Sequence, residues 1–306
     1  MTTLVFGHKS PDTDSTGSPI IWAWYLKNFH GVDAKPVLLG EPNTEALFVL
    51  DRWKLDKPEI ISHVAPETPV VIVDTNNPAE LPDGINDCDI KAIIDHHKLV
   101  GGLETKGPIH IVMEPLACTA TIMWKTIGAH SAKVPDAIKG AALSCILSDT
   151  LEFRSPTTTD QDRAIAEALA KDLGVDIAAY AAEMFAAKSD VSSFSEAELL
   201  RMDSKEYKVG DTQLRVSVLE TTSPQMVLGR KDALMAAMPD VASADGADQV
   251  LLFVIDILNE EATLLVPNDL VKAIAQQSFG AVVSGDTVVL PGVMSRKKQI
   301  IPNLKI

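Results

Sequence analysis

Short apolar runs that end in an acidic residue or a histidine constrain the fold of this chain more than any other feature. The runs Leu4–Phe6, Val70–Val73 and Ala92–Ile94 are continuous rather than alternating, which is typical of strands buried on both faces of a parallel sheet. Because stretches with helical periodicity separate and follow these runs, the pattern predicts an α/β fold with a mainly parallel sheet. The predicted strands are Thr3–Gly7, Val37–Gly40, Val70–Asp74, Lys91–Asp95 and Ile109–Met113, and the predicted helices are Ser15–Phe29, Thr44–Lys54, Thr119–Ala129, Asp136–Thr150, Thr159–Leu173 and Ile177–Lys188.

The pattern changes after a short polar segment, residues 189–195 (SDVSSFS), which is poor in helix formers and is interpreted as a linker. We therefore expect a first domain over residues 1–188 and a smaller α/β domain over residues 196–306, which a chain of 306 residues can accommodate. In the second domain the predicted strands are Gln213–Leu219, Val250–Leu258, Ala262–Val266 and Thr287–Leu290, and the predicted helices are Ser223–Met238 and Asp269–Phe279.

Charge and cysteine content narrow the functional classes. The net charge of −15 disfavours a general nucleic-acid or anionic membrane surface, but bound cations can still make one cleft attractive to a small anion. Cys88, Cys118 and Cys145 are odd in number and widely spaced, so neither a disulfide framework nor a zinc–thiolate site is expected. With no signal-peptide pattern and no apolar window of membrane-spanning length, we expect a cytoplasmic protein without a membrane partner.

Four polar clusters lie at the ends of predicted elements. Three of them are at the carboxyl ends of strands, which is where open α/β sheets bind their ligands. Pro11 argues against a helix across the first cluster, so its acidic residues are expected in a loop. Each cluster alone could be a solvated turn or a helix cap. The clusters are GHKSPDTDS with His8, Asp12 and Asp14, VDTN with Asp74, DHHK with His96 and His97, and LSDT with Asp149.

The combination of clusters predicts a site for two divalent cations. Three clusters end strands that should share one edge of the sheet, and carboxylates brought that close repel one another unless cations intervene. Imidazole together with carboxylate suits Mn²⁺, Co²⁺, Fe²⁺ or Zn²⁺ better than Mg²⁺. The carboxylates of Asp12, Asp14, Asp74 and Asp149 would balance the two cations, and His8 and His96 would each supply a nitrogen.

The two histidines of DHHK are expected to have different tasks. Adjacent residues of an extended chain point to opposite sides, so His96 would face a metal while His97 served another purpose. Asp95 is then left to orient a histidine rather than to bind metal.

Basic residues gather in the second predicted domain. Lys205 lies in DSKEY, and SRKKQ brings together Arg296, Lys297 and Lys298 in an otherwise acidic chain. Guanidinium and ammonium groups match phosphate oxygens. A solvated basic tail is the alternative interpretation.

In this order, GHKSPDTDS, VDTN, DHHK and LSDT resemble the signature of the DHH phosphoesterase superfamily. The added SRKKQ, with Lys205, resembles the family II (manganese-dependent) inorganic pyrophosphatases, and the resemblance covers residues 3–302. It implies an inorganic diphosphatase that splits pyrophosphate into two phosphates through in-line attack of a metal-bridged hydroxide. It also implies a DHH catalytic domain, an active site between the two domains, and a homodimer formed through edge strands. The implied cofactors are two Mn²⁺ per subunit, with Co²⁺ as an alternative, and Mg²⁺ bound with the substrate.

The resemblance also implies roles for individual residues. His8, Asp12, Asp74 and Asp149 would hold one metal, and Asp14, Asp74, His96 and Asp149 the other. Phosphate binding is implied for His97, Lys205, Arg296 and Lys297, and catalytic roles for His97, Asp14 and Lys205. The chain departs from the family's usual first motif at Ser10, where asparagine is usual, but no ligand is lost.

Two alternatives remain open. Another phosphoesterase of the superfamily, such as an exopolyphosphatase or a nuclease of short oligonucleotides, would typically carry a glycine-rich C-terminal motif in place of SRKKQ. A non-catalytic metal-binding protein on the same scaffold would have lost at least one ligand, whereas every ligand position is filled.

Overall fold

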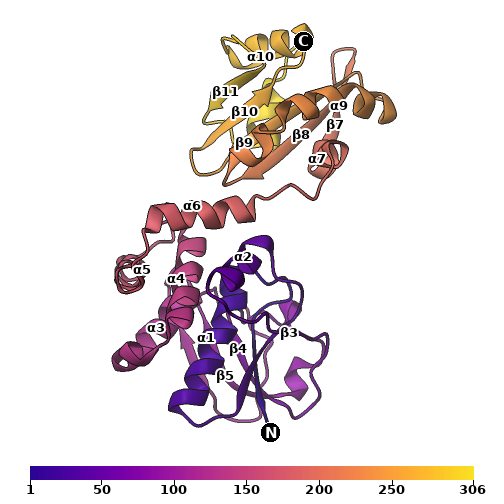
Figure 1. Ribbon diagram of the computed structural model, residues 1–306. Helices are drawn as coiled ribbons and strands as arrows, with labels where there is room; N and C mark the ends of the chain where they lie inside the picture. Colours follow the sequence, from indigo (N-terminus) through magenta and orange to yellow (C-terminus); the bar gives the residue numbers. More distant parts are fainter. The chain divides into compact units, whose positions relative to one another are not determined.

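The computed structural model describes residues 1–306, which divide into two compact units, Met1–Lys188 and Ser189–Ile306. Each unit contains one sheet with helices packed on it (Figure 1). The segment 189–195, predicted to be a linker, is anchored to the second unit, because Arg230 donates hydrogen bonds of 2.8 Å to the carbonyl oxygens of Val191 and Phe194. None of the helices is long and apolar enough to cross a membrane.

The first unit has an all-parallel sheet of six strands in the order β3-β2-β1-β4-β5-β6. This confirms the predicted parallel sheet, and it places β1, β4 and β5, whose ends carry the polar clusters, side by side. The elements are β1 Thr3–Phe6, α1 Thr13–Phe29, β2 Ala34–Leu38, α2 Thr44–Arg52, β3 Glu59–Ile60, β4 Pro69–Val73, β5 Asp89–Asp95, β6 His110–Met113, α3 Thr119–Ile127, α4 Asp136–Thr150, α5 Asp160–Leu173 and α6 Ile177–Lys188.

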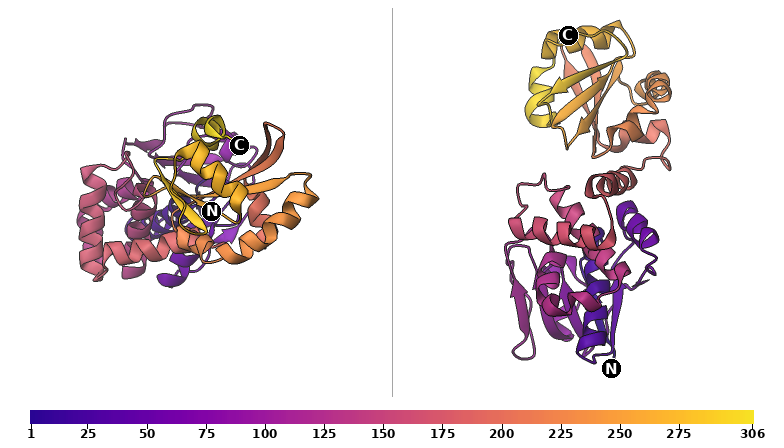
Figure 2. Two further views of the ribbon diagram at one scale, coloured as in Figure 1. Left: turned by 90° about the horizontal axis from the view of Figure 1, so that it is seen from above. Right: turned by 60° about the vertical axis from the view of Figure 1, so that its left-hand side comes forward.

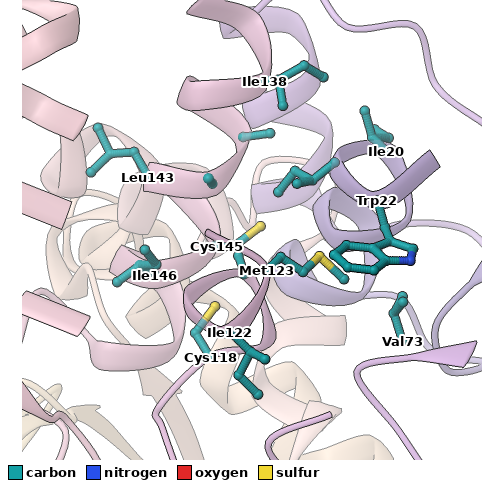
Figure 3. Close-up of a cluster of buried hydrophobic side chains, with 14 of the residues drawn as sticks. Ile20, Trp22, Val73, Cys118, Ile122, Met123, Ile138, Leu143, Cys145 and Ile146 are labelled. Atoms are coloured by element: carbon teal, nitrogen blue, oxygen red, sulfur yellow. The ribbon is translucent and has the colours of Figure 1, made fainter. Parts of the chain in front are cut away.

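Both faces of this sheet are buried, which explains the continuous apolar runs. Alternate residues of β4 point to opposite faces: Val71 and Val73 join the core under the helices, whereas Val70 and Ile72 pack beneath loops. Figure 3 shows part of the helical side of this core, built from side chains of α1, α3 and α4. Helices α5 and α6 form an outer layer that packs against α4 and α2 (Figure 2).

A close contact between α1 and α4 helps to place two of the predicted ligands. At Gly17 an added Cβ would lie 2.4 Å from Cys145 Sγ, so no larger residue fits without movement. Gly17 lies about one turn after Asp14, and Cys145 about one turn before Asp149. The contact therefore brings the start of α1 against the end of α4.

The second unit confirms the prediction of a smaller α/β domain. Its five strands follow the order β11-β10-β9-β8-β7, and only β8 and β9 are parallel. Helix α10 packs on one face of the sheet, and α7 and α9 pack on the other. The elements are α7 Glu196–Met202, β7 Ser204–Val209, β8 Thr212–Thr221, α8 Pro224–Leu228, α9 Lys231–Ala244, β9 Gln249–Asp256, β10 Glu261–Leu265, α10 Asp269–Phe279 and β11 Thr287–Pro291.

The structure corrects one expectation for the second unit and adds two elements that were not predicted. The single helix predicted over Ser223–Met238 is two helices, α8 and α9, which are separated at Gly229 and Arg230. The Arg230 side chain donates a hydrogen bond of 2.7 Å to Glu196. Strand β7 was not predicted because SKEYKV, at the sheet edge, has little of the apolar pattern of a buried strand. Helix α7 was also missed, although Ser195 and Glu198 form a capping box at its start.

Candidate active site

Asp74 lies at the centre of the polar groups that gather at the carboxyl edge of the first sheet. It follows β4 directly, and its backbone has φ of 58°, a left-handed conformation that aspartate tolerates better than most residues. His8 Nε2 is 3.5 Å from Asp74 Oδ2, and His96 Nε2 is 3.4 Å from Asp74 Oδ1. The carboxylate therefore presents a separate oxygen to each histidine.

Asp12 and Asp14 reach the site from the start of α1. Asp12 is the N-cap residue, and its carboxylate accepts a hydrogen bond of 2.9 Å from the Ser15 amide. The expected loop conformation is wrong for Asp14, which lies in the first turn of the helix. Pro11 precedes the N-cap, so it does not interrupt the helix. Asp12 is thus both a cap and a candidate ligand, two interpretations that do not exclude each other.

The predicted ligands form groups in which each residue offers one donor atom, and the donor atoms of a group lie within 4.8 Å of one another. One group contains His8, Asp12 and Asp74, and another contains Asp14, His96 and Asp149, the last from the final turn of α4. A third contains Asp74, His96 and His97. The structure therefore brings together every predicted metal ligand, and it also places His97, predicted to bind substrate, within reach of them.

The two adjacent histidines do not point to opposite sides, so that expectation is wrong. Their ring centroids are 4.2 Å apart. Strand β5 ends at Asp95, and its carboxylate Oδ1 accepts hydrogen bonds from both the His97 backbone N (3.0 Å) and its Nδ1 (2.9 Å), which draws that ring back. The orienting role predicted for Asp95 is confirmed.

A hydrogen bond at Nδ1 of His96 leaves the other ring nitrogen, Nε2, available to a metal. Its Nδ1 lies 3.1 Å from the carbonyl oxygen of Leu116, which can only accept, so Nδ1 carries the proton. The lone pair of Nε2 is then free and faces Asp74 at 3.4 Å. Metal-binding histidines are commonly fixed in this way by a partner on the other ring nitrogen.

The electrostatics of the cluster favour a bound cation. Burial, followed by the neighbouring carboxylates of Asp14 and Asp12, raises the pKa of both Asp74 and Asp149 well above the usual range. Oδ2 of Asp149 is buried and has no hydrogen-bond partner. Buried carboxylate oxygens are rarely left in this state unless another group binds them. The mixed carboxylate and imidazole donors fit a Mn²⁺-like ion.

Two supporting residues were not identified from the sequence. Thr119, at the start of α3, donates its backbone N–H to Asp14 Oδ2 (2.7 Å) and its hydroxyl to Asp74 Oδ1 (3.1 Å). Asn76 donates to Asp95 Oδ2 at 2.6 Å. Burial would raise the pKa of Asp95, but the hydrogen bonds from His97 and Asn76 outweigh that effect and lower it. Asn76 could have been identified because it belongs to the VDTN motif, whereas no local sequence pattern indicates the role of Thr119.

The predicted phosphate-binding cations of the second unit lie together although they are distant in sequence. Lys205, on β7, and Arg296 and Lys297, in the helical turn Arg296–Ile300, line a cavity of about 520 Å³. Arg296 donates to the Asp203 carbonyl oxygen (2.8 Å) and carboxylate (2.7 Å), which fixes its guanidinium. His97, the fourth predicted phosphate-binding residue, lines a separate cavity of about 570 Å³ in the first unit.

Cys118 and Cys145 belong to none of the candidate metal-binding groups. Burial raises the pKa of the Cys118 and Cys145 thiols well above the usual range. Both side chains are free and lie in the core drawn in Figure 3. A thiol kept protonated in this way is a poor nucleophile and a poor metal ligand.

Fold and site together define a two-domain protein of the DHH phosphoesterase class. The model of the DHH family, N-terminal domain, matches residues 2–148, and the DHHA2 domain model matches residues 182–305.

Full-length relatives identify the family within this class. The chain is 40% identical over 306 residues to a protein from Deinococcus radiodurans and 36% identical over 303 residues to one from Lactobacillus acidophilus, both named "Probable manganese-dependent inorganic pyrophosphatase". In both pairs the similarity covers 98% of this chain and 97% of the relative. The chain belongs to the family II, manganese-dependent inorganic pyrophosphatases, which confirms the predicted family.

A solved structure agrees with this assignment. The crystal structure of a Methanococcus jannaschii protein assigned to the family II inorganic pyrophosphatases is similar with a TM-score of 0.61 and 31% identity. The similarity covers 99% of this chain and 98% of that one.

Proposed function

We propose that this protein hydrolyses inorganic pyrophosphate to two phosphates. The observation that carries the proposal is the arrangement around Asp74, which offers one oxygen to His8 and the other to His96 inside a cluster of further carboxylates. The relatives named as manganese-dependent pyrophosphatases support pyrophosphate as the substrate.

Two divalent cations, Mn²⁺ with Co²⁺ as an alternative, are proposed to bind this cluster, and Mg²⁺ to accompany the substrate. The donor set supports two sites: His8, Asp12 and Asp74 for one, and Asp14, His96 and Asp149 for the other. Asp74 is proposed to bridge them, and the resemblance extends bridging to Asp149. Two cations held there would supply Lewis-acid activation of a water, so that hydroxide would be available near neutral pH for in-line attack at phosphorus.

The chain's own residues are proposed to place the substrate and move protons. His97, with Nδ1 donating to Asp95, has its Nε2 free to contact a phosphate or to protonate the leaving group. Asp14, whose carboxylate accepts hydrogen bonds from Ser18 Oγ (2.6 Å) and from the Thr119 amide (2.7 Å), is proposed to take up a proton during hydrolysis.

The cations of the second unit are proposed to bind phosphate oxygens of the substrate. Lys205, Arg296 and Lys297 supply a guanidinium fork and two ammonium groups, which match the charge and geometry of phosphate. Lys205 is proposed to contact the phosphate at which substitution occurs.

Phosphate release from pyrophosphate tests the proposed function. The enzyme would be preincubated with Mn²⁺ or with Mg²⁺ and assayed in the presence of Mg²⁺, with polyphosphate and short oligonucleotides as alternative substrates. We expect rapid release from pyrophosphate alone. Absence of release with every metal would overturn the proposal, and preferential release from polyphosphate would favour an exopolyphosphatase.

We further propose that the protein is a cytoplasmic homodimer. Strand β6 is an edge strand paired only with β5, and the side chain of Ile111 in its centre is 55% exposed. An exposed edge of this kind readily pairs with another chain. The three cysteines are all free, as in proteins of reducing compartments. Sedimentation equilibrium would distinguish a dimer from a chain of 32.9 kDa.

Removal of metal is expected to destabilise the protein, and increasingly so as the pH rises. Because the pKa values of Asp74 and Asp149 are raised in the folded state, the metal-free protein binds more protons folded than unfolded. The stabilising contribution of these two groups is therefore fully present at low pH, and it is lost as the pH rises from the ordinary carboxyl value of 3.8 through the raised native values. Bound Mn²⁺ would take the place of the protons on Asp74 and Asp149 and would offset the repulsion between the neighbouring carboxylates.

Scanning calorimetry with and without EDTA measures this effect. A ligand at a hundred times its dissociation constant contributes about 2.7 kcal/mol, so at pH 7.5 Mn²⁺ should raise the melting temperature by about 5–10 °C. The difference should shrink toward pH 5, where protons compete with the metal. Equal melting temperatures with Mn²⁺ and with EDTA at pH 7.5 would argue against metal binding at this cluster.

Replacement of Arg296 by lysine is expected to weaken substrate binding. The variant keeps the charge but loses the planar fork that is fixed by Asp203. A hydrogen bond to a charged group contributes about 1.5–3 kcal/mol, so kcat/KM should fall about 10- to 100-fold. Lys298→Ala is the matched control, because Lys298 is an exposed neighbour in the same turn. Equal effects of the two variants would contradict the assigned role.

A further inference from the structure

A carboxylate outside the candidate ligand groups is fully buried behind the cluster. Glu45, in the first turn of α2, has an exposed fraction of 0%. Its Oε2 accepts hydrogen bonds from Thr13 Oγ1 (3.0 Å) and Ser148 Oγ (2.8 Å), and Lys188 Nζ lies 3.3 Å away. Its Oε1 is buried without a partner. A buried charge is costly unless it is well paired, so its place here calls for a reason other than packing.

The partners of Glu45 are neighbours of the candidate ligands. Thr13 lies between Asp12 and Asp14, and Ser148 directly precedes Asp149. One carboxylate oxygen therefore joins the first turn of α1 to the last turn of α4, the two segments that carry three of the candidate carboxylate ligands.

Glu45 is itself held firmly. Asn43, the N-cap of α2, accepts a hydrogen bond from the Ala46 amide at 2.8 Å. The Asn43 backbone N–H donates to the Pro11 carbonyl oxygen at 3.1 Å, just before the N-cap Asp12 of α1. The start of α2 is thus tied to the same loop that delivers the first cluster.

The cationic partner lies at the end of the first unit. Lys188 is the last residue of α6 and of the unit Met1–Lys188. Its side chain is partly exposed, so the ion pair neutralises Glu45 while the carboxylate remains buried. Lys188, which is not one of the candidate ligands, therefore offsets the negative charge of Glu45.

We propose that Glu45 is a positioning residue for the metal site: through Thr13 and Ser148 it fixes Asp12, Asp14 and Asp149 at the separation that two cations require. Glu45 touches neither metal nor substrate. The inference rests on the proposed metal-dependent function, and it predicts that metal affinity depends on the negative charge and the acceptor oxygen of Glu45 rather than on its volume.

Two variants of similar volume test the proposal in the full-length protein. Glu45→Gln keeps one acceptor oxygen, whereas Glu45→Met keeps none. Loss of a residue that orients metal ligands typically costs 10- to 100-fold in metal affinity. We therefore expect Mn²⁺ binding, followed by electron paramagnetic resonance of the free ion, to weaken about 10-fold in Glu45→Gln and about 100-fold in Glu45→Met. Excess Mn²⁺ should restore most of the activity of Glu45→Gln.

Leu169→Ala is the control, because Leu169 is a buried core residue of α5 and lies among neither the candidate ligands nor the partners of Glu45. It should lower the melting temperature while leaving the Mn²⁺ affinity unchanged. If the Glu45 variants only lower the melting temperature and bind Mn²⁺ like the wild type, Glu45 is a packing residue and the inference fails. If Glu45→Met does not fold, Glu45→Gln alone decides. Failure of the wild type to bind Mn²⁺ would instead overturn the proposed function.

Discussion

Replacement of Asp74 by asparagine is expected to remove both metals and to lower kcat about a thousandfold or more. The two oxygens of this carboxylate lie 3.5 Å from His8 Nε2 and 3.4 Å from His96 Nε2. A bound metal contributes several kcal/mol to transition-state stabilisation, and each 1.36 kcal/mol corresponds to about a tenfold change in rate. Loss of the shared ligand should therefore affect catalysis more than loss of either histidine.

Asparagine is a well-matched substitute at this position. It has the same shape as aspartate and tolerates the left-handed φ of 58°. Its side-chain oxygen can still accept the hydrogen bond of 3.1 Å from Thr119 Oγ1. A loss of activity in Asp74→Asn would thus reflect the missing charge rather than a distorted backbone.

Elemental analysis after gel filtration measures the metal content of this variant. The wild type should carry two Mn²⁺ per chain, Asp74→Asn should carry none, and His96→Gln should mainly lose one. Asp136→Asn is the control, because Asp136 is exposed at the opposite end of α4. A full complement of metal in Asp74→Asn would contradict the proposed bridge.

Asp149→Asn extends this test to the second proposed bridge. The structure groups Asp149 with Asp14 and His96, whereas the family resemblance has it contact both metals. Loss of both ions in Asp149→Asn would support bridging. Loss of one ion would confine Asp149 to the site that it shares with His96.

The residues that meet at the carboxyl edge of the first sheet could be predicted, because the sequence patterns that indicate them are local. A continuous apolar run followed by Asp74 or His96 indicates a buried parallel strand that ends at a polar edge. Since α/β connections bring such ends to one side of a sheet, the meeting of these residues with His8 followed from the pattern. The bounds of α4 were also predicted correctly, because Pro135 and a long apolar stretch define them.

The remaining features depend on tertiary contacts that leave no local pattern. The hydrogen bond from Thr119 to Asp14 joins residues that are 105 positions apart in the sequence, and the one from Ser148 to Glu45 joins residues that are 103 positions apart. The side-by-side rings of His96 and His97 arise because Asp95 binds both the backbone and the ring of His97, which overrides the alternation of an extended chain. These contacts position the candidate ligands, whereas the candidate ligands themselves could be found in the motifs.

Replacement of His97 by glutamine is expected to lower kcat about 100-fold or more while both metals remain bound. General acid catalysis typically contributes about 10²- to 10⁴-fold. Glutamine can occupy the position and donate a hydrogen bond, but it cannot transfer a proton at neutral pH. Because His97 also lies within reach of Asp74 and His96, its role as a ligand must be tested at the same time. Full Mn²⁺ content together with low activity would support the substrate role, and loss of one Mn²⁺ would identify His97 as a ligand instead.

The pH dependence of the reaction provides a further test of whether His97 acts as the general acid. The hydrogen bond from His97 to Asp95 raises the pKa of His97, and this effect exceeds the opposing effect of burial. The protonated ring therefore persists to higher pH than an ordinary histidine, and kcat should decline only as the pH rises through that raised value. In Asp95→Asn the charged partner is lost, so the pKa of His97 falls and the decline in kcat should move to lower pH. An unchanged alkaline limb in Asp95→Asn would show that the proton given to the leaving group does not come from His97.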